Sequence, residues 1–238
     1  MSGPRMDGRV AVITGVGRSG QAGQAVAAAF GSLGAHCVLL DRNAGEVAER
    51  AAELRAAGAS AEAHACDLTD ASALGAVASS LATRASGEVH SLVCLAGGYA
   101  GAAVADTAPE AWQRMFDVNV TTAFLTTRAF LPLVRRGRGA IVYFASAAAL
   151  PGNRVSGHVA YAAAKTGVLT LMRAVAAEEH KHGVRANALA PTAIRTASNL
   201  ATLDPGTSYV ERETVADWVT LLCSEAAGSV NGQVIKLG

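Results

Sequence analysis

A tyrosine and a lysine lie four residues apart in the segment 161–165, which reads YAAAK. Residues four apart share one face of a helix, so a helix here brings the phenol of Tyr161 and the ammonium of Lys165 together. An ammonium about 4 Å from a phenolate, at an effective dielectric constant near 20, stabilises it by roughly 4 kcal/mol, or about three pKa units. We therefore predict that Tyr161 exchanges a proton with a substrate oxygen near neutral pH.

Two further polar side chains fall where they can join this pair. Ser146 follows an apolar run at 140–144 that is typical of a strand. Its hydroxyl is therefore expected at the carboxyl end of a sheet, where open α/β folds bind ligands. Asn119 lies inside a helical pattern, although asparagine is a mediocre helix former. The alternatives are a serine that caps a helix or loop and an asparagine bonded to its own backbone.

A glycine-rich stretch, TGVGRSGQAG at 14–23, follows the first apolar run. Glycine lets a backbone approach a pyrophosphate, which the N-terminus of the following helix then stabilises. Asp41 ends the second apolar run, about where a carboxylate usually holds a ribose diol. This spacing predicts a dinucleotide site rather than a plain strand–turn–helix joint. The glycines of the stretch proposed to contact the dinucleotide are Gly15, Gly17, Gly20 and Gly23.

The charge of Asp41 also bears on which dinucleotide binds. A carboxylate at this position repels a 2′-phosphate, so NAD(H) is favoured. Arg42 is adjacent and Arg18 lies in the turn, and either guanidinium can bind that phosphate instead. NADP(H) therefore stays open as the alternative cofactor.

Short apolar runs alternate with longer helical patterns along the chain, and the apolar runs do not alternate with polar residues. Such strands belong in a parallel sheet covered by helices. We predict one α/β domain over 1–238: a single doubly wound, Rossmann-like parallel sheet of about seven strands with helices on both faces. The predicted strands are 9–14, 35–40, one ending at 65–67, 91–95, 140–144, 185–190 and 233–237. The predicted helices are 22–33, 44–57, one from 69 or 70 to about Ala85, 109–136 with a break, 160–182 and 211–224.

Composition excludes several classes of protein. Lys and Arg total 20 against 19 Asp and Glu, and this near-neutral balance argues against a nucleic-acid surface. Hydrophobic residues make up 51%, which excludes a disordered chain. The uncharged stretch 19–40 contains glycines and polar residues that a membrane span disfavours, and the first residues lack the apolar core of a signal peptide. Four scattered cysteines without metal-ligand spacing predict reduced thiols in a cytoplasmic protein with no metal site.

The order of these features resembles the short-chain dehydrogenase/reductase family over essentially the whole chain. The resemblance rests on 14–23, Asp41, Asp67, Asn119, Ser146, Tyr161, Lys165 and 191–196. It implies hydride transfer between a nicotinamide cofactor and a carbonyl or secondary alcohol, as in 3-oxoacyl or small-ketone reductases. By the same resemblance, Tyr161 is the general acid/base, and Lys165 lowers its pKa and binds the nicotinamide ribose. Ser146 then orients the substrate oxygen, and Asn119 holds a water of the proton relay.

The resemblance also implies the remaining contacts and the assembly. Asp67 contacts the adenine, Ile194 and Thr196 line the nicotinamide carboxamide, and a short substrate lobe spans about 192–212. A homo-oligomer, tetramer or dimer, is expected through helices at about 121–135 and 160–182. The expected cofactor contacts are Gly15, Gly17, Arg18, Gly20, Gly23, Asp41, Arg42, Asp67, Leu68, Ala96, Gly97, Tyr161, Lys165, Pro191, Ile194 and Thr196.

Departures from the family pattern leave alternatives open. The glycine-rich turn is about two residues longer than usual, and 94–97 reads CLAG where the family has Asn-Asn-Ala-Gly. The loop 96–101 and the short lobe with Asn199 are similar to quinonoid dihydropteridine reductase. Tyr99 of this chain would then stack on a flat ring of the substrate, and the alternative is that it covers the cofactor. Ser146 favours an ordinary ketone reductase instead. A redox sensor that binds a dinucleotide without catalysis is a second alternative. A methyltransferase-like fold is a third, which leaves the spacing of Tyr161 and Lys165 unexplained.

Overall fold

The computed structural model describes residues 5–84 and 87–238. Its main feature is a seven-stranded sheet in which every pair of neighbouring strands is parallel. The strand order is β3-β2-β1-β4-β5-β6-β9. The strands are β1 (Val10–Thr14), β2 (His36–Asp41), β3 (Ser60–Ala65), β4 (Ser91–Cys94), β5 (Ala140–Phe144), β6 (Arg185–Pro191) and β9 (Val234–Leu237).

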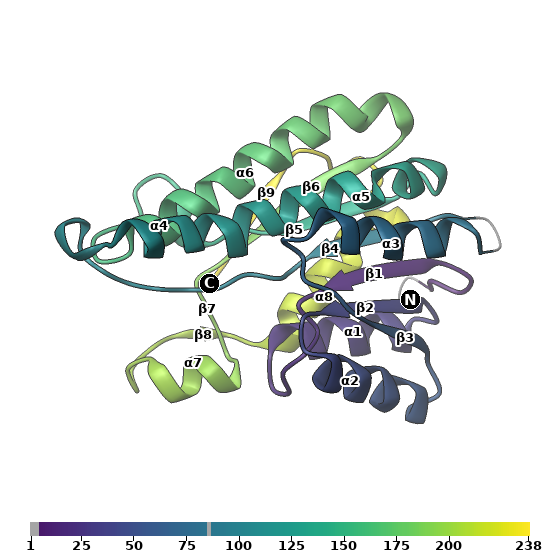
Figure 1. Cartoon of the computed structure of the whole chain (residues 1–238), viewed down its shortest axis with the longest axis horizontal. Helices are drawn as coiled ribbons and strands as arrows, with labels where there is room; N and C mark the ends of the chain where they lie inside the picture. The colour runs from purple at the N-terminus through teal and green to yellow at the C-terminus, as the bar shows by residue number, and fades with distance from the viewer. Residues whose placement is uncertain (1–4, 85–86) are drawn as a thin grey trace.

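Helices cover both faces of this sheet (Figure 1). One face carries α1 (Ala22–Ser32), α2 (Ala44–Ala56) and α8 (Arg212–Cys223), and the other carries α3 (Ala71–Ala82), α5 (Thr122–Arg136) and α6 (Val159–Glu179). Each layer buries its own hydrophobic cluster against the sheet. Alternate residues of β1 serve the two layers: Ile13 packs in the cluster of Phe30, and Val12 packs in the cluster of Phe130. Because both faces are covered, the strands are apolar throughout, as predicted.

The strand order reverses direction between β1 and β4. Strands β2 and β3 extend from β1 to one side, and β4, β5, β6 and β9 extend to the other. In open α/β sheets, ligands bind in the crevice outside the carboxyl ends of the strands at such a reversal. The fold therefore places its binding crevice beside the ends of β1 and β4.

The predicted fold class is confirmed, and most predicted elements lie within two residues of those observed. Two parts differ. The predicted break in helix 109–136 is a π-helical turn at Asp117–Thr121, which joins α4 (Pro109–Phe116) to α5. The predicted helix end near Ala85 lies outside the described residues, and α3 ends at Ala82.

The short lobe expected at about 192–212 contains secondary structure that was not predicted. It contains a two-stranded sheet, β7 (Ala193–Ile194) with β8 (Tyr209–Val210), and the helix α7 (Ala197–Thr202). The hydroxyl of Thr196 caps α7 by accepting from the backbone N–H of Asn199. In Figure 1, α7 stands away from the main sheet. No helix within the described ranges is long and apolar enough to cross a membrane.

Candidate active site

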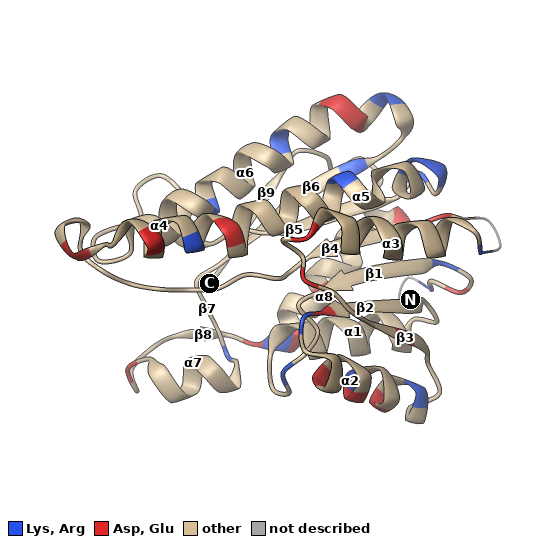
Figure 2. Ribbon diagram, in the orientation of Figure 1, with Lys and Arg blue, Asp and Glu red and all other residues tan. Residues whose placement is uncertain are grey.

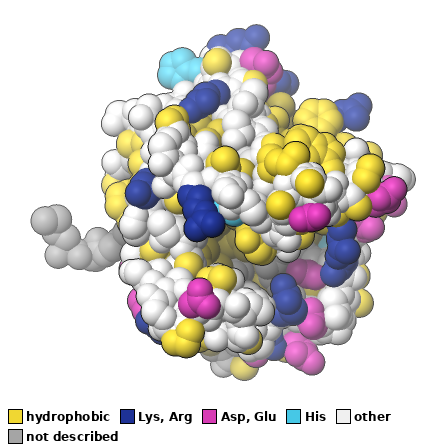
Figure 3. Space-filling view, turned by 90° about the vertical axis from the view of Figure 1, so that its left-hand side faces the viewer, with side chains coloured by type: hydrophobic (Ala, Val, Ile, Leu, Met, Phe, Trp, Pro, Cys, Tyr) yellow, Lys and Arg dark blue, Asp and Glu magenta, His cyan; other side chains and the backbone are white. Residues whose placement is uncertain are grey.

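The candidate site residues come together because the strands are parallel. Gly15 follows β1, Asp41 ends β2, Ala96 follows β4, Ser146 follows β5, and Pro191 ends β6. The carboxyl ends of parallel strands meet at one edge of the sheet, so residues far apart in the sequence share one crevice. In Figure 3 this side of the molecule is hollowed between an upper and a lower part.

The glycine-rich turn is packed too tightly for side chains at several positions. Gly15 adopts a φ of +75°, and a Cβ on it would lie 2.9 Å from the Ala96 Cα. A Cβ on Gly23 would collide with the carbonyl oxygen of Gly15. A Cβ on Gly17 would lie 2.7 Å from the carboxyl carbon of Asp41. The turn therefore leaves bare backbone at the start of α1, which is the arrangement that accepts a pyrophosphate.

Thr14 is a positioning residue for this crevice that sequence reasoning passed over. Its buried hydroxyl donates to the Val93 carbonyl (3.2 Å) and accepts from the backbone N–H groups of Leu95 (3.1 Å) and Ala96 (3.2 Å). These bonds tie the end of β1 to the loop after β4. A threonine that ends the first strand, directly before a glycine-rich turn, is the signal that was available.

Lys165 is buried beneath the crevice, with its ammonium donating to the Phe144 carbonyl (2.8 Å). Burial lowers the pKa of Lys165 to about 8. Its Nζ lies 5.8 Å from the centre of the Tyr161 ring, so the helix places the two side chains side by side as predicted. The end of β5 therefore fixes the lysine beside the tyrosine.

The structure does not lower the pKa of Tyr161 as the spacing predicted. Burial raises the pKa of Tyr161, and the Ser146 hydroxyl acts in the opposite direction. The sequence estimate treated the pair as solvent-screened neighbours and left out the cost of removing a phenolate from water. The Lys165 ammonium is directed at a backbone carbonyl rather than at the phenol oxygen.

Ser146 has the capping role, and this role leaves its proton unused. It caps a short 3-10 turn, Ala147–Ala149, by accepting from the Ala148 N–H at 3.2 Å. Because its oxygen is the acceptor in that bond, its own proton stays available to a substrate oxygen. The side chain is buried and close enough to Tyr161 to affect the phenol's pKa.

Asn119 lies in the π-helical turn, where the helical ladder is interrupted. Its Nδ2 donates to the carbonyls of Met115 (2.9 Å) and Gly98 (3.0 Å), and its Oδ1 accepts from the Gly98 N–H (3.3 Å). A Cβ on Gly97 would lie 2.6 Å from Asn119 Oδ1 and 3.2 Å from Lys165 Nζ. The alternative of local backbone bonding is thus observed, and the same bonds hold the loop after β4 next to the lysine.

The residues expected around the adenosine separate into exposed and buried ones. Asp41 accepts from the Asn43 N–H at 3.1 Å, and Arg42 is exposed beside it. Hydrogen bonds from Thr69 lower the pKa of the Asp67 carboxyl, with a smaller effect of the nearby Arg42 cation. The Leu68 side chain is buried in the hydrophobic cluster of the α3 face, so it is a core residue. Only its backbone is left to contact a cofactor.

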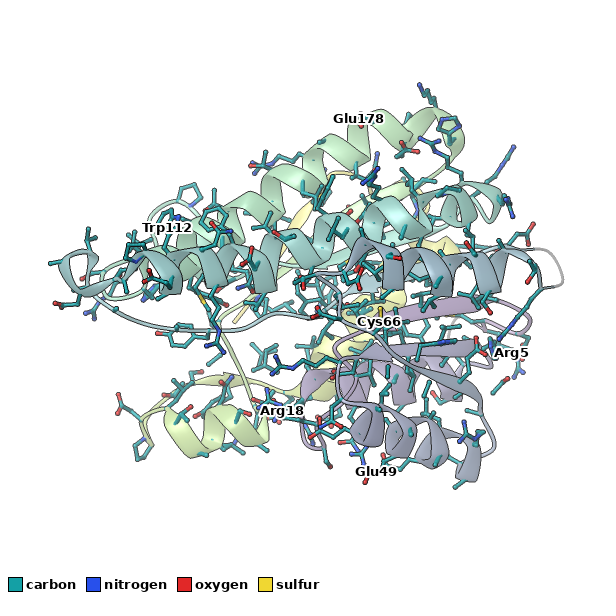
Figure 4. All side chains as sticks on the ribbon, in the orientation of Figure 1. Arg5, Arg18, Glu49, Cys66, Trp112 and Glu178 are labelled. Carbon is teal, nitrogen blue, oxygen red and sulfur yellow. The ribbon has the colours of Figure 1, made fainter. Side chains whose placement is uncertain are left out.

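The longer glycine-rich turn contacts α7. The Ala197 N–H donates to the Gly20 carbonyl (2.9 Å), and Gln21 Nε2 donates to Ser198 Oγ (3.0 Å). Arg18 Nη1 lies 3.5 Å from the same Ser198 oxygen, and Figure 4 shows Arg18 between α7 and the turn. We call the Gln21–Ser198 and Gly20–Ala197 contacts the clasp. It joins the predicted pyrophosphate site to the predicted substrate lobe.

The remaining expected cofactor contacts line the route from β6 to α7. Pro191 is buried at the end of β6, and Thr196 is buried where it caps α7. Ile194 is half-buried, and its carbonyl accepts from Asn199 Nδ2 at 2.8 Å. These three residues share one short stretch of backbone that crosses the carboxyl edge of the sheet.

An exposed tyrosine stands over the candidate acid/base. The ring of Tyr99 is 64% exposed and meets the ring of Tyr161 edge-on, with the centroids 5.0 Å apart. The ring of His158 lies 6.3 Å from Tyr99. Tyr99 therefore borders the space in front of the Tyr161 hydroxyl and is free to contact a ligand there.

The donor set fits a dinucleotide and not a metal. Bare turn backbone, the Asp41 carboxylate and the buried Lys165 would hold its pyrophosphate, adenine-side ribose and nicotinamide-side ribose, respectively. Across the described ranges, no group of three His, Cys, Asp or Glu side chains is arranged to bind a metal ion.

Gly97 provides a test of this geometry. The Gly97→Ala variant should lose at least tenfold in NADH affinity, measured by fluorescence, because its methyl group displaces Asn119 Oδ1 and Lys165 Nζ. The control is Gly75→Ala in α3, where no atom lies within 4 Å of the added carbon. That variant should bind NADH normally and unfold with a free energy unchanged or raised by about 0.5–1 kcal/mol. Normal NADH binding in Gly97→Ala would contradict the packing described here.

Comparison with known proteins identifies the same family over most of the chain. A family model described as short chain dehydrogenase matches residues 9–204. Galactitol 2-dehydrogenase of Rhizobium johnstonii is 34% identical, over 98% of this chain and 95% of that protein.

Solved structures agree. The gluconate 5-dehydrogenase of Burkholderia cenocepacia, in complex with NADP and tartrate, superposes with a TM-score of 0.90 at 27% identity, covering 98% of this chain and 94% of that one. A 7α-hydroxysteroid dehydrogenase complexed with NADH and a 7-oxo bile acid superposes with a TM-score of 0.89 at 28% identity, covering 98% and 94%. The chain belongs to the short-chain dehydrogenase/reductase family.

Proposed function

We propose that this oxidoreductase transfers hydride between NAD(H) and a small ketone or secondary alcohol, with Tyr161 as general acid/base. The observation that carries the proposal is the convergence of Tyr161, Ser146 and Lys165 at the carboxyl edge of the sheet. A redox sensor has no use for a phenol placed beside a buried ammonium and a free serine proton. The relatives named above act on an alcohol or ketone, which favours this reading over a pterin substrate.

Each residue has a distinct task in the proposed reaction. A bound nicotinamide supplies or accepts the hydride. During reduction, Tyr161 gives its phenol proton to the substrate oxygen, and Ser146 donates a hydrogen bond to the same oxygen. The Lys165 ammonium stabilises the phenolate that is left, because a cation in a partly desolvated site interacts more strongly than in water. Asn119 holds the loop at Gly98 and keeps the site around Lys165 in place.

We further propose that the segment 192–212, which contains β7, α7 and β8, is the substrate lobe and covers one side of the crevice. The clasp holds it next to the pyrophosphate site. The four cysteines are all buried and unpaired, which supports a cytoplasmic protein with reduced thiols. The expected partner is a small molecule, with no role for nucleic acid.

Tyr161→Phe tests the catalytic assignment. Loss of the proton donor should reduce turnover about 10²–10⁴-fold, the usual contribution of general acid/base catalysis, while NADH still binds. Turnover is measured with NADH and a panel of ketones, secondary alcohols and quinonoid pterins. The matched control is Tyr143→Phe, in which the lost hydroxyl is buried against Thr127 and away from the crevice. Undiminished turnover in Tyr161→Phe would refute the role. Tight NADH binding by the wild type without any turnover would favour the sensor.

Asp41→Asn tests the cofactor preference. Removing the carboxylate charge abolishes repulsion of a 2′-phosphate next to Arg18 and Arg42. The ratio of kcat/KM for NADPH to that for NADH should rise at least tenfold, equivalent to about 1.4 kcal/mol. Asp217→Asn, on the exposed side of α8, should leave the ratio unchanged. A wild type that already prefers NADPH would overturn the assignment of NAD(H).

We also propose a homo-oligomer that pairs α5 and α6 with their copies. Phe124 on α5 is 47% exposed, so its apolar ring is available to pack against a second copy of the chain. Sedimentation of the wild type should show a dimer or tetramer, and Phe124→Glu should shift it towards the 24.0 kDa monomer. Val104→Glu, at a still more exposed position (75%) that lies outside both helices, should leave the assembly intact. A wild type that sediments only as a monomer would refute the proposal.

A further inference from the structure

A second cavity, of about 330 Å³, lies at the opposite edge of the sheet from Tyr161. It is formed where strands begin: Arg9 precedes β1, His90 precedes β4, Arg138 precedes β5, and Arg185 is the first residue of β6. The length of β5, from Ala140 in this cavity to Phe144 beside Lys165, separates it from the candidate active site. The cavity therefore belongs to neither the cofactor nor the substrate site.

The charges around this cavity do not balance. Three arginines (Arg9, Arg138 and Arg185) line it, against one carboxylate, Glu225, which pairs with Arg9. With the histidines neutral, the lining carries a formal charge of +2 in a chain whose total is +1. Figure 2 shows basic residues gathered at this end of α5 and α6. A bound group with two negative charges would neutralise the lining.

Arg185 contributes the most buried of the positive charges in this cavity that lack a carboxylate partner among the described residues. Its half-buried guanidinium donates to the carbonyls of Val230 (3.2 Å) and Ser224 (3.1 Å), and burial lowers its pKa. Among the described residues it has no carboxylate partner. Buried charges in proteins are normally paired, because removing a charge from water is costly.

His90 adds a neutral donor to the cavity wall. The Val10 N–H donates to His90 Nδ1 at 3.2 Å, so the proton of the neutral ring is on Nε2. Burial and the nearby Arg9 lower the pKa of His90, which keeps the ring neutral at pH 7. Its Nε2 lies 3.7 Å from Glu88, beyond hydrogen-bond distance, so that N–H is free to donate to an anion.

Arg138 is free to move towards a ligand. The Arg138 side chain is exposed, and its aliphatic stem lies beside Gly183. Its guanidinium has no ion-pair partner within the described part of the chain. Arg135 and Lys181 lie near the C-terminal ends of α5 and α6, where a cation stabilises the helix dipole. The positions of these two cations are explained without a ligand. That explanation does not extend to Arg9, which directly precedes β1, or to Arg185, the first residue of β6.

We propose that this cavity binds a dianionic phosphate group, held by Arg138 and Arg185 with a hydrogen bond from His90. Two sources have this chemistry: inorganic phosphate and the phosphate of a phosphomonoester. The proposal is independent of the proposed catalytic function, because no residue of the cavity contacts the crevice.

Calorimetric titration of the full chain with inorganic phosphate tests the proposal. The titration is run at constant ionic strength, with and without saturating NADH, so that binding at the pyrophosphate site is recognised. We expect one saturable site per chain that NADH does not block. Arg138→Ala should weaken binding at least tenfold, Arg138→Lys should weaken it less, and Arg173→Ala, exposed elsewhere on α6, should leave it unchanged. Normal thermal unfolding of Arg138→Ala shows that the variant is folded.

A second titration distinguishes the two sources. Tighter binding of glycerol 3-phosphate than of inorganic phosphate would indicate a phosphomonoester, and equal affinity would indicate that the phosphate group alone is recognised. The proposal is overturned if phosphate does not bind or if chloride at equal ionic strength gives the same response. It is also overturned if NADH abolishes binding or if Arg138→Ala binds as the wild type does.

Discussion

The Thr14 hydroxyl joins the two halves of the sheet at the place where the strand order reverses. It bonds to the carbonyl of Val93 and to two N–H groups of the loop that follows β4. Strands β1 and β4 pair directly, and the chains that leave them separate at the reversal. The Thr14 bonds continue the connection beyond the paired residues and into the loop after β4. With it, the approach of Gly15 to Ala96 is fixed from within the buried sheet. The rest of the site is built outward from that pair.

Backbone groups, more than side chains, hold the reactive residues in place. Lys165 is anchored by the carbonyl at the end of β5, and Asn119 is anchored by carbonyls of Met115 and Gly98. Carbonyls fix a cation in position without neutralising it. The charge of Lys165 therefore remains available to the phenol, which an ion pair with a carboxylate would have cancelled. This explains why no acidic residue is needed beside the lysine.

The fold and the positions of the reactive residues were predictable because they depend on periodicity and strand order. Apolar runs gave the sheet, and four-residue spacing placed Tyr161 beside Lys165. The direction of the Tyr161 pKa shift was wrong because burial cannot be read from spacing. The clasp was missed because Gln21 and Ser198 are far apart in sequence, and neither residue type is distinctive. The break in the helical pattern at 109–136 was predicted, but its form, a π-helical turn whose Asn119 bonds to the Gly98 carbonyl, was not.

The segment that carries α7 is attached to the molecule almost entirely by its ends and by the clasp. No residue of α7 is buried, so the helix adds nothing to either hydrophobic cluster. Substitutions along it therefore escape the stability cost that core positions impose. Under the substrate-lobe role proposed for this segment, mutation can revise which molecules the protein accepts while the sheet, the glycine-rich turn and the Tyr161–Lys165 pair stay as they are. Folding and substrate choice would then be carried by separate residues, each free to evolve without the other.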